Sequence, residues 1–160
     1  MRRRRFFVGL GLMAGLSGCA TRHPIPDADP DASWSGRLAI TVLEETPQHF
    51  SAAFELAGAA EAGEIRLISP LGQLIGLARW SAQGAELMRG NERQIYPNMH
   101  ELTLALTGTA LPLTPLFHWL RGQPVELDGW QADLSRLTDG RLSARRVHPL
   151  PPVQLRIVLQ

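Results

Sequence analysis

Apolar residues that alternate with polar ones along short stretches are the feature that most constrains the fold of this chain. Successive side chains of a β-strand point to opposite faces, so an alternation of period two predicts a strand with one buried face. Many short antiparallel strands whose edges need protection predict a curved sheet or barrel. The alternating stretches are residues 38–42, 50–56, 65–67, 130–137, 141–147 and 153–159, with 74–80 and 85–89 joined as a hairpin by Ser81-Ala82-Gln83-Gly84.

Two stretches in the middle of the chain follow a helical period instead. Asn98 can cap a helix that ends at Gly108. A second helix is predicted with Thr114 as N-cap, Pro115 at the first helical position and Gly122 at the end. Their apolar stripes consist of Leu102 and Leu106 in the first helix and of Leu116, Trp119 and Leu120 in the second. We expect these stripes to pack against the concave face of the sheet, where an apolar lining could hold a hydrophobic ligand.

The first 18 residues are typical of a secretory signal peptide. Arginines at positions 2–5 precede an apolar stretch, residues 6–16, that is shorter than the ~20 residues needed to span a bilayer. The segment ends in Leu16-Ser17-Gly18-Cys19, which resembles the lipobox of bacterial lipoproteins. In that family the cysteine thiol takes a diacylglyceryl group, the chain is cut just before it, and the new amine is acylated. The other interpretation of Cys19, the only cysteine, is a free thiol that follows a signal.

Residues 19–33 are predicted to be a lipidated tether, because three prolines and three aspartates leave little apolar surface to pack. Three acyl chains, at ~0.8 kcal/mol per buried methylene, would hold the chain to a membrane essentially permanently. Ala20 stands where a retention signal would place aspartate, so the resemblance implies transport to the outer membrane. The predicted globular domain comprises residues 34–160.

Charge and side-chain chemistry argue against several classes of function. Beyond the signal peptide the chain has 12 arginines, no lysine and 15 acidic residues, a balance that argues against nucleic-acid binding and against a basic patch for a membrane surface. The five histidines lack metal-ligand spacing, and the sequence has no Gly-x-Ser-x-Gly motif. We therefore expect no catalytic residue, no metal and no cofactor.

One loop carries an unusual apolar residue. Ser69-Pro70-Leu71-Gly72 joins two predicted strands, and proline and glycine favour a tight turn there. Leu71 then either points into water from the tip of the turn or folds back to cap the core.

Several short motifs follow one another along the chain: the lipobox and residues 34–39, 50–54, 65–72, 108–113, 119–124 and 129–130. These motifs occur in the same order in the LolB family, which the chain resembles over nearly its whole length. LolB proteins are outer-membrane receptors that accept lipoproteins from the periplasmic carrier LolA and insert them.

The resemblance implies a mainly β fold, an incomplete antiparallel β-barrel with a helical plug that encloses a hydrophobic cavity. It also implies a periplasm-facing, lipid-anchored monomer whose partners are LolA, lipoprotein acyl chains and outer-membrane lipids. The family's protruding apolar residue, which helps to insert cargo into the bilayer, corresponds to Leu71. Our candidates for the acyl-chain cavity are Phe50, Phe54, Leu67, Leu116, Trp119 and Leu120; plain core packing is the other interpretation of each.

Two other functions remain open on the sequence. A structural or assembly-factor lipoprotein would have a packed barrel without lipid cargo. A soluble carrier like LolA would lack the lipid anchor, so Cys19 argues against it.

Overall fold

Nine β-strands and two α-helices make up the computed structural model, which describes residues 32–160. The strands are β1 (Ser33–Val42), β2 (Gln48–Gly58), β3 (Gly63–Ile68), β4 (Leu74–Ser81), β5 (Gly84–Arg89), β6 (Glu92–Tyr96), β7 (Trp130–Asp133), β8 (Arg141–Arg146) and β9 (Val153–Leu159). The helices, α1 (Met99–Thr107) and α2 (Leu113–Leu120), lie between β6 and β7 in the chain. The predicted signal peptide, Cys19 and the predicted tether up to residue 31 lie outside the described residues.

All nine strands belong to a single antiparallel sheet. Their order across the sheet is β6-β5-β4-β3-β2-β1-β9-β8-β7. β1 to β6 pair in chain order, as do β7 to β9, and β9 joins the two groups by pairing with the free side of β1. β6 and β7 are the two edges, and the sheet does not close on itself. Among residues 32–160, no helix is long and apolar enough to cross a membrane.

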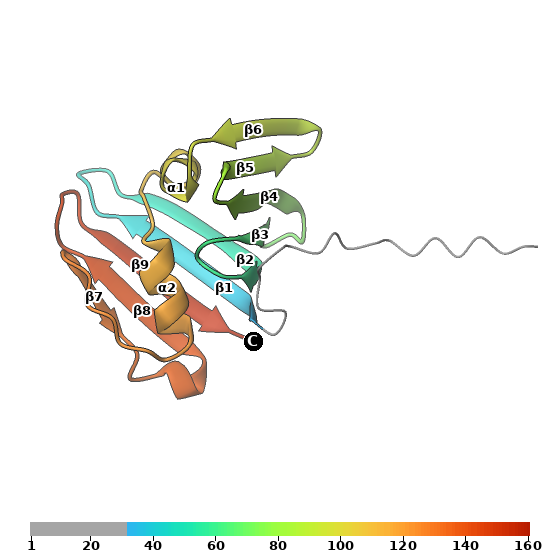
Figure 1. Ribbon diagram of the computed structural model, residues 1–160. Helices are drawn as coiled ribbons and strands as arrows, with labels where there is room; N and C mark the ends of the chain where they lie inside the picture. Colours follow the sequence, from blue (N-terminus) through green and yellow to red (C-terminus); the bar gives the residue numbers. More distant parts are fainter. Residues whose placement is uncertain (1–31) are drawn as a thin grey trace, which may run out of the picture.

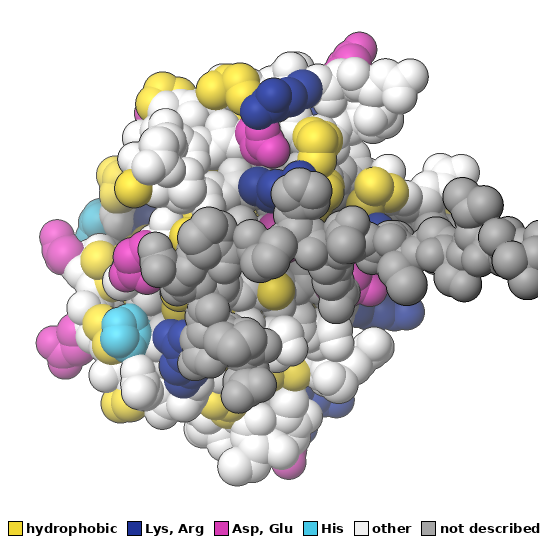
Figure 2. Space-filling model, turned by 45° about the vertical axis from the view of Figure 1, so that its right-hand side comes forward, with side chains coloured by type: hydrophobic (Ala, Val, Ile, Leu, Met, Phe, Trp, Pro, Cys, Tyr) yellow, Lys and Arg dark blue, Asp and Glu magenta, His cyan; other side chains and the backbone are white. Residues whose placement is uncertain are grey.

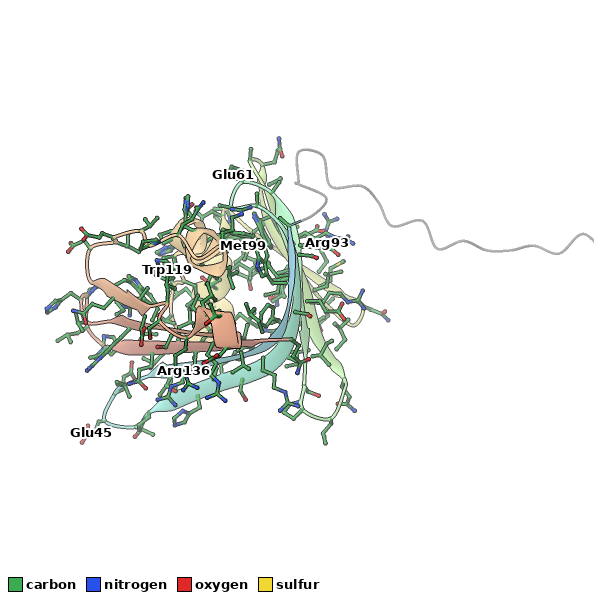
Figure 3. The ribbon with its side chains drawn as sticks, turned by 90° about the horizontal axis from the view of Figure 1, so that it is seen from below. Glu45, Glu61, Arg93, Met99, Trp119 and Arg136 are labelled. Atoms are coloured by element: carbon green, nitrogen blue, oxygen red, sulfur yellow. The ribbon has the colours of Figure 1, made fainter. Side chains whose placement is uncertain are left out.

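Both helices lie on the concave side of the sheet. The strands curl around α1 and α2 (Figure 1), and seen from below, Met99 and Trp119 lie on the inner side of the curve (Figure 3). The strands turn their alternate apolar side chains, such as Ile40, Phe54 and Leu155, toward the helices to form one core. Because burial of apolar surface is the main driving force of folding, this shared core holds the helices inside the sheet. The predicted incomplete antiparallel barrel with a helical plug is thereby confirmed.

A close approach of two central strands depends on Gly36 of β1. Gly36 is paired with Leu159 of β9, and a Cβ atom at this position would lie 2.0 Å from the carbonyl oxygen of Val158. A side chain there would force the two strands apart. The glycine therefore permits the pairing that joins the two halves of the sheet.

The caps of α1 agree with the sequence prediction, whereas α2 begins earlier than predicted. Asn98 accepts a hydrogen bond from the backbone N–H of Glu101 at 3.0 Å, and Gly108 ends α1 in the left-handed conformation. The predicted N-cap of α2, Thr114, was wrong, because Pro112 accepts the first helical hydrogen bond, from the backbone N–H of Leu116 at 3.0 Å.

Two strand predictions also differ from the structure. Sequence analysis missed β6, whose side chains are nearly all exposed and therefore lack apolar alternation. The predicted strand 130–137 was too long: β7 ends at Asp133, whose carboxylate accepts a hydrogen bond from the backbone N–H of Ser135 at 3.0 Å and turns the chain. A short 3₁₀ helix, Leu137–Asp139, follows.

Candidate lipid-binding site

α2 is fixed inside the sheet by aromatic contacts from its buried face. The ring of Phe117 lies 5.5 Å from that of Trp34 on β1, in an edge-to-face arrangement, and 6.3 Å from that of Trp80 on β4. The indole of Trp80 is itself oriented by hydrogen bonds to the backbone oxygens of Ala59 and Ala60. Large aromatic side chains that interlock in this way hold the helix in one position.

The other aromatic residue of α2 lies against the edge of the sheet. Trp119 is 1% exposed, and its ring lies 6.1 Å from that of Trp130 on β7. Its indole N–H donates a 3.1 Å hydrogen bond to the backbone oxygen of Val125, which ties α2 to the segment that leads into β7. This contact places an apolar wall next to an irregular, exposed segment.

A hollow of about 670 Å³ opens at this place, and we call it the Trp119 groove. Its volume lies within the ~300–1,000 Å³ of typical small-molecule sites. The side chains of Val125, Leu127 and Trp130 supply apolar surface, whereas acidic residues lie along the same segment. The lining residues are Trp119, Pro124, Val125, Glu126, Leu127, Asp128, Gly129, Trp130, Gln131, Ala132 and Leu134.

The six predicted cavity residues lie on the inner side of the sheet or on α2. Five of them belong to the buried core, and Phe50 is half-buried against it. Trp119 also lines the groove. The cavity role of these residues stays a prediction. Those in the core are Phe54, Leu67, Leu116, Trp119 and Leu120.

The groove segment between α2 and β7 is the part of the candidate site that sequence analysis missed. Residues 124–129 have no helical period, and only two apolar residues, Val125 and Leu127, alternate there with polar ones. That alternation, next to Trp130, is the signal that could have drawn attention to the segment. It was too short to predict a strand, and the structure has an isolated bridge between Leu127 and Trp130 instead.

Leu71 is at the tip of the loop that joins β3 to β4, and it points into water. Its side chain is 87% exposed, which excludes the alternative that it folds back onto the core. The turn beneath it is closed by hydrogen bonds from the backbone N–H groups of Ser69 to the oxygen of Gln73, at 2.8 Å, and of Gly72 to the oxygen of Ser69, at 2.9 Å. A rigid turn therefore presents one apolar side chain away from the protein.

The exposed apolar residues are otherwise dispersed. On the face in Figure 2, hydrophobic side chains are scattered among arginines and acidic residues. Single exposed apolar residues are common on soluble surfaces and need no special explanation. What sets Leu71 apart is the combination of near-complete exposure and a hydrogen-bonded turn that fixes it.

Two arginines lie beside the aromatic part of the site. The guanidinium of Arg121, directly after α2, lies 5.5 Å from the ring centre of Trp34 and 5.8 Å from that of Phe117. Arg146 is paired with Trp130 across β7 and β8, and it donates a 3.1 Å hydrogen bond to the backbone oxygen of Pro151. Partial burial lowers the pKa of Arg146, although an arginine remains charged at neutral pH.

The polar side chains of the site do not form a metal centre or a nucleophile–base pair. Within residues 32–160, no group of three or more His, Cys, Asp or Glu side chains is close enough to hold a metal ion. His118 on α2 makes a 2.7 Å hydrogen bond to the side chain of Gln123. What the arrangement offers is a groove in which apolar side chains lie beside polar and acidic ones in about equal measure.

Comparison with known proteins gives a consistent family. The family Outer membrane lipoprotein LolB matches residues 31–148. A Bordetella petrii protein, Outer-membrane lipoprotein LolB, is 26% identical over 98% of this chain and 92% of its own length. Proteins of the same name from Azoarcus sp. and Chromobacterium violaceum are 27% and 30% identical over 86% and 78% of this chain, and 83% and 70% of their own lengths. The chain therefore belongs to the LolB family of outer-membrane lipoproteins.

Proposed function

We propose that this chain receives lipoproteins from LolA by taking their acyl chains into the Trp119 groove, and that the loop at Leu71 then guides them into the bilayer. As a LolB protein it is a non-enzymatic receptor that inserts lipoproteins into the outer membrane, and it interacts with LolA and with lipoproteins. The proposal adds where on the molecule each step takes place.

The observation that carries the proposal is the position of the groove between a buried aromatic wall and an open segment. An acyl chain that enters beside Trp119 would exchange water for apolar surface, which stabilises it by about 25 cal/mol per Å². No bond needs to form or break. Transfer from carrier to receptor then requires only that the receptor bind the chains more tightly than the carrier does.

The loop at Leu71 supports the second step. A leucine that is 87% exposed gains nothing from burial in the folded domain, but it gains free energy when its side chain enters the hydrocarbon region of a membrane. We infer that Leu71 contacts the outer membrane during delivery and disturbs the lipids where cargo enters.

The anchor supplies placement. We infer that Cys19 carries the lipid and that residues 19–33 act as the tether, whose last residue, Ser33, already begins β1. Because a fully extended chain spans at most ~3.6 Å per residue, a stretch of this length would keep the domain within about 50 Å of the membrane that receives its cargo.

A transfer experiment tests the groove. LolA loaded with a fluorescent lipoprotein is mixed with the receptor, and the lipoprotein that becomes receptor-bound is measured. Leu127→Asp places a charge in the groove without removing a core residue, and we expect it to lower acceptance at least tenfold. The matched control is Ile95→Asp on β6, where the side chain is already 66% exposed. Equal acceptance by both variants would overturn the groove assignment.

The buried state of five predicted cavity residues favours a second candidate, a structural lipoprotein with a packed barrel. A fluorescent fatty-acid analogue separates the two functions, because the packed barrel would show no displaceable binding. In the cell, depletion of this protein separates the two functions. Loss of the receptor would stop delivery of other lipoproteins to the outer membrane, whereas loss of a structural protein would not.

A further inference from the structure

Four arginines gather on the outer face of the sheet, away from the helices. They are Arg37 on β1, Arg141 and Arg145 on β8, and Arg156 on β9, and all four are exposed. Their neighbours in the same strands, such as Leu38, Ala144 and Leu155, point inward to the core, so the strand alternation turns the arginines outward.

The pairing of the strands brings these like charges together around Arg156. Arg156 lies opposite Ser143 on β8, so Arg141 and Arg145 flank it on that side as diagonal neighbours. On its other side it lies opposite Ala39, next to Arg37. Diagonal neighbours across a sheet are about 7–8 Å apart, and like charges at such separations repel.

Within the part of the chain that the structure describes, no ion pair involves the arginines of this cluster, and the one acidic residue paired into it is Asp133, opposite Ser143. Among residues 32–160, the ion pairs involve Arg66, Arg79, Arg93 and Arg136 and none of the four arginines of the outer face. Glu55, the acid diagonal to Arg37, is engaged by Arg66 at 3.5 Å. The same residues include 11 arginines and 12 acidic residues, so the cluster is a local excess on a domain that is nearly neutral.

A hollow of about 270 Å³ lies within the cluster. Arg145 and Arg156 border it, and Gln131, Ser143 and Gln154 add side chains that can donate hydrogen bonds. Asp133 borders it too, and hydrogen bonds from Ser135 lower the pKa of this carboxyl group. Two guanidinium groups with neutral donors between them match a phosphodiester, which has one negative charge and several acceptor oxygens.

We propose that this outer face binds the anionic headgroups of the membrane to which the protein is anchored, with the phosphodiester of a phospholipid in the hollow. The first argument is the length of chain before β1: 17 residues lie between Cys19 and Arg37, and 12 of them precede the described residues, so an anchor at Cys19 keeps this strand close to a lipid surface. Because the anchor limits the distance between Arg37 and the membrane, it raises the effective concentration of lipid headgroups at the cluster.

The second argument is continuity with the loop at Leu71. Ile68, Ala53, Arg37, Val158 and Arg141 lie in one row across five neighbouring strands. The row is about 20 Å long, since neighbouring strands are about 4.8 Å apart. It leads from the arginines to Ile68, three residues before Leu71. A membrane fits both ends of this row, because it offers phosphate to the arginines and hydrocarbon to the leucine.

The test measures how close the outer face comes to the lipid. The chain has one cysteine, which is the expected lipid attachment site, so Val158→Cys gives a single position for a fluorophore next to Arg37 and Arg141. The anchored protein is reconstituted in phosphatidylcholine vesicles with or without phosphatidylglycerol. Quenching by a headgroup-labelled lipid then reports contact. A chain without the engineered cysteine must take up no label.

We expect phosphatidylglycerol to increase quenching, and Arg145→Gln with Arg156→Gln to shift the contact equilibrium back by about 25-fold, or about fivefold per arginine. Arg89→Gln, an exposed arginine on β5, is the control for net charge and leaves quenching unchanged. Asp133→Asn keeps an acceptor for the turn, removes the negative charge from the hollow and increases quenching.

Four results would overturn the proposal. Quenching that is equal in the two kinds of vesicle would show that headgroup charge is not recognised. A loss of contact in the Arg89 variant as large as that caused by Arg145→Gln or Arg156→Gln alone would show that net charge alone matters. Loss of contact on addition of millimolar inorganic phosphate would indicate a site for free phosphate instead of a lipid, and contact that requires an acidic protein would indicate a protein surface.

Discussion

We expect the Leu71→Glu substitution to block insertion of the lipoprotein into the membrane and to leave its acceptance from LolA intact. Leu71 is 87% exposed and closes no part of the core, so the substitution changes the free energy of unfolding by no more than about 0.5 kcal/mol. At the membrane, the leucine side chain contributes about 2 kcal/mol when it leaves water. Its loss slows insertion about 30-fold, and the carboxylate adds a further penalty for entry into the lipid.

The assay follows a fluorescent lipoprotein from LolA to the receptor and then to vesicles. We expect the Leu71→Glu variant to accept the lipoprotein normally and to retain it, with Leu71→Ala between this variant and the original chain. Leu150→Glu is the matched control, because Leu150 is 73% exposed in the loop between β8 and β9. Loss of acceptance in the Leu71→Glu variant, or normal insertion by it, would refute the reasoning.

Three predictions concern the scaffold. Gly36→Ala places a Cβ atom 2.0 Å from the carbonyl oxygen of Val158, so it should lower the free energy of unfolding by about 3 kcal/mol, measured by urea titration. An unchanged free energy of unfolding would argue against the tight contact between β1 and β9. Asn98→Ala removes the cap of α1 and should cost about 1 kcal/mol in the same titration, whereas Asn98→Asp, which keeps the acceptor, should not. Hydrogen bonds from Ser135 lower the pKa of Asp133, so they support the turn at neutral pH and are lost as the pH falls through this lowered value. An NMR titration should find the pKa of the Asp133 carboxyl group below 3.8, and a pKa above 3.8 would contradict the hydrogen-bonded turn.

The sequence predicted those parts of the fold that have buried, regular patterns. β1, β2 and β9 are half-buried strands, and their apolar alternation reflects a core on one side. β6 has no such face, and only the Gly90-Asn91 pair, a two-residue hairpin turn with Gly90 at a φ of 57°, indicates it in the sequence.

The candidate site was less predictable because it is built from residues distant in the chain. Leu71 could be singled out, since an apolar residue between Pro70 and Gly72 is unusual, but its direction required the structure. The Trp119 groove combines the end of α2 with an irregular segment, and no local period encodes that contact. The arginine cluster exists only through the register of β1, β8 and β9, which the sequence does not specify.

Photo-crosslinking from the groove tests the central claim most directly. A photoreactive amino acid replaces Leu127 in the groove or, as a control, Ile95 on β6, and the receptor is irradiated while LolA delivers a lipoprotein with labelled acyl chains. We predict that the label crosslinks to position 127 and not to position 95. Labelled acyl chains that leave LolA and reach the bilayer without crosslinking to position 127 would contradict the claim that they pass through the Trp119 groove.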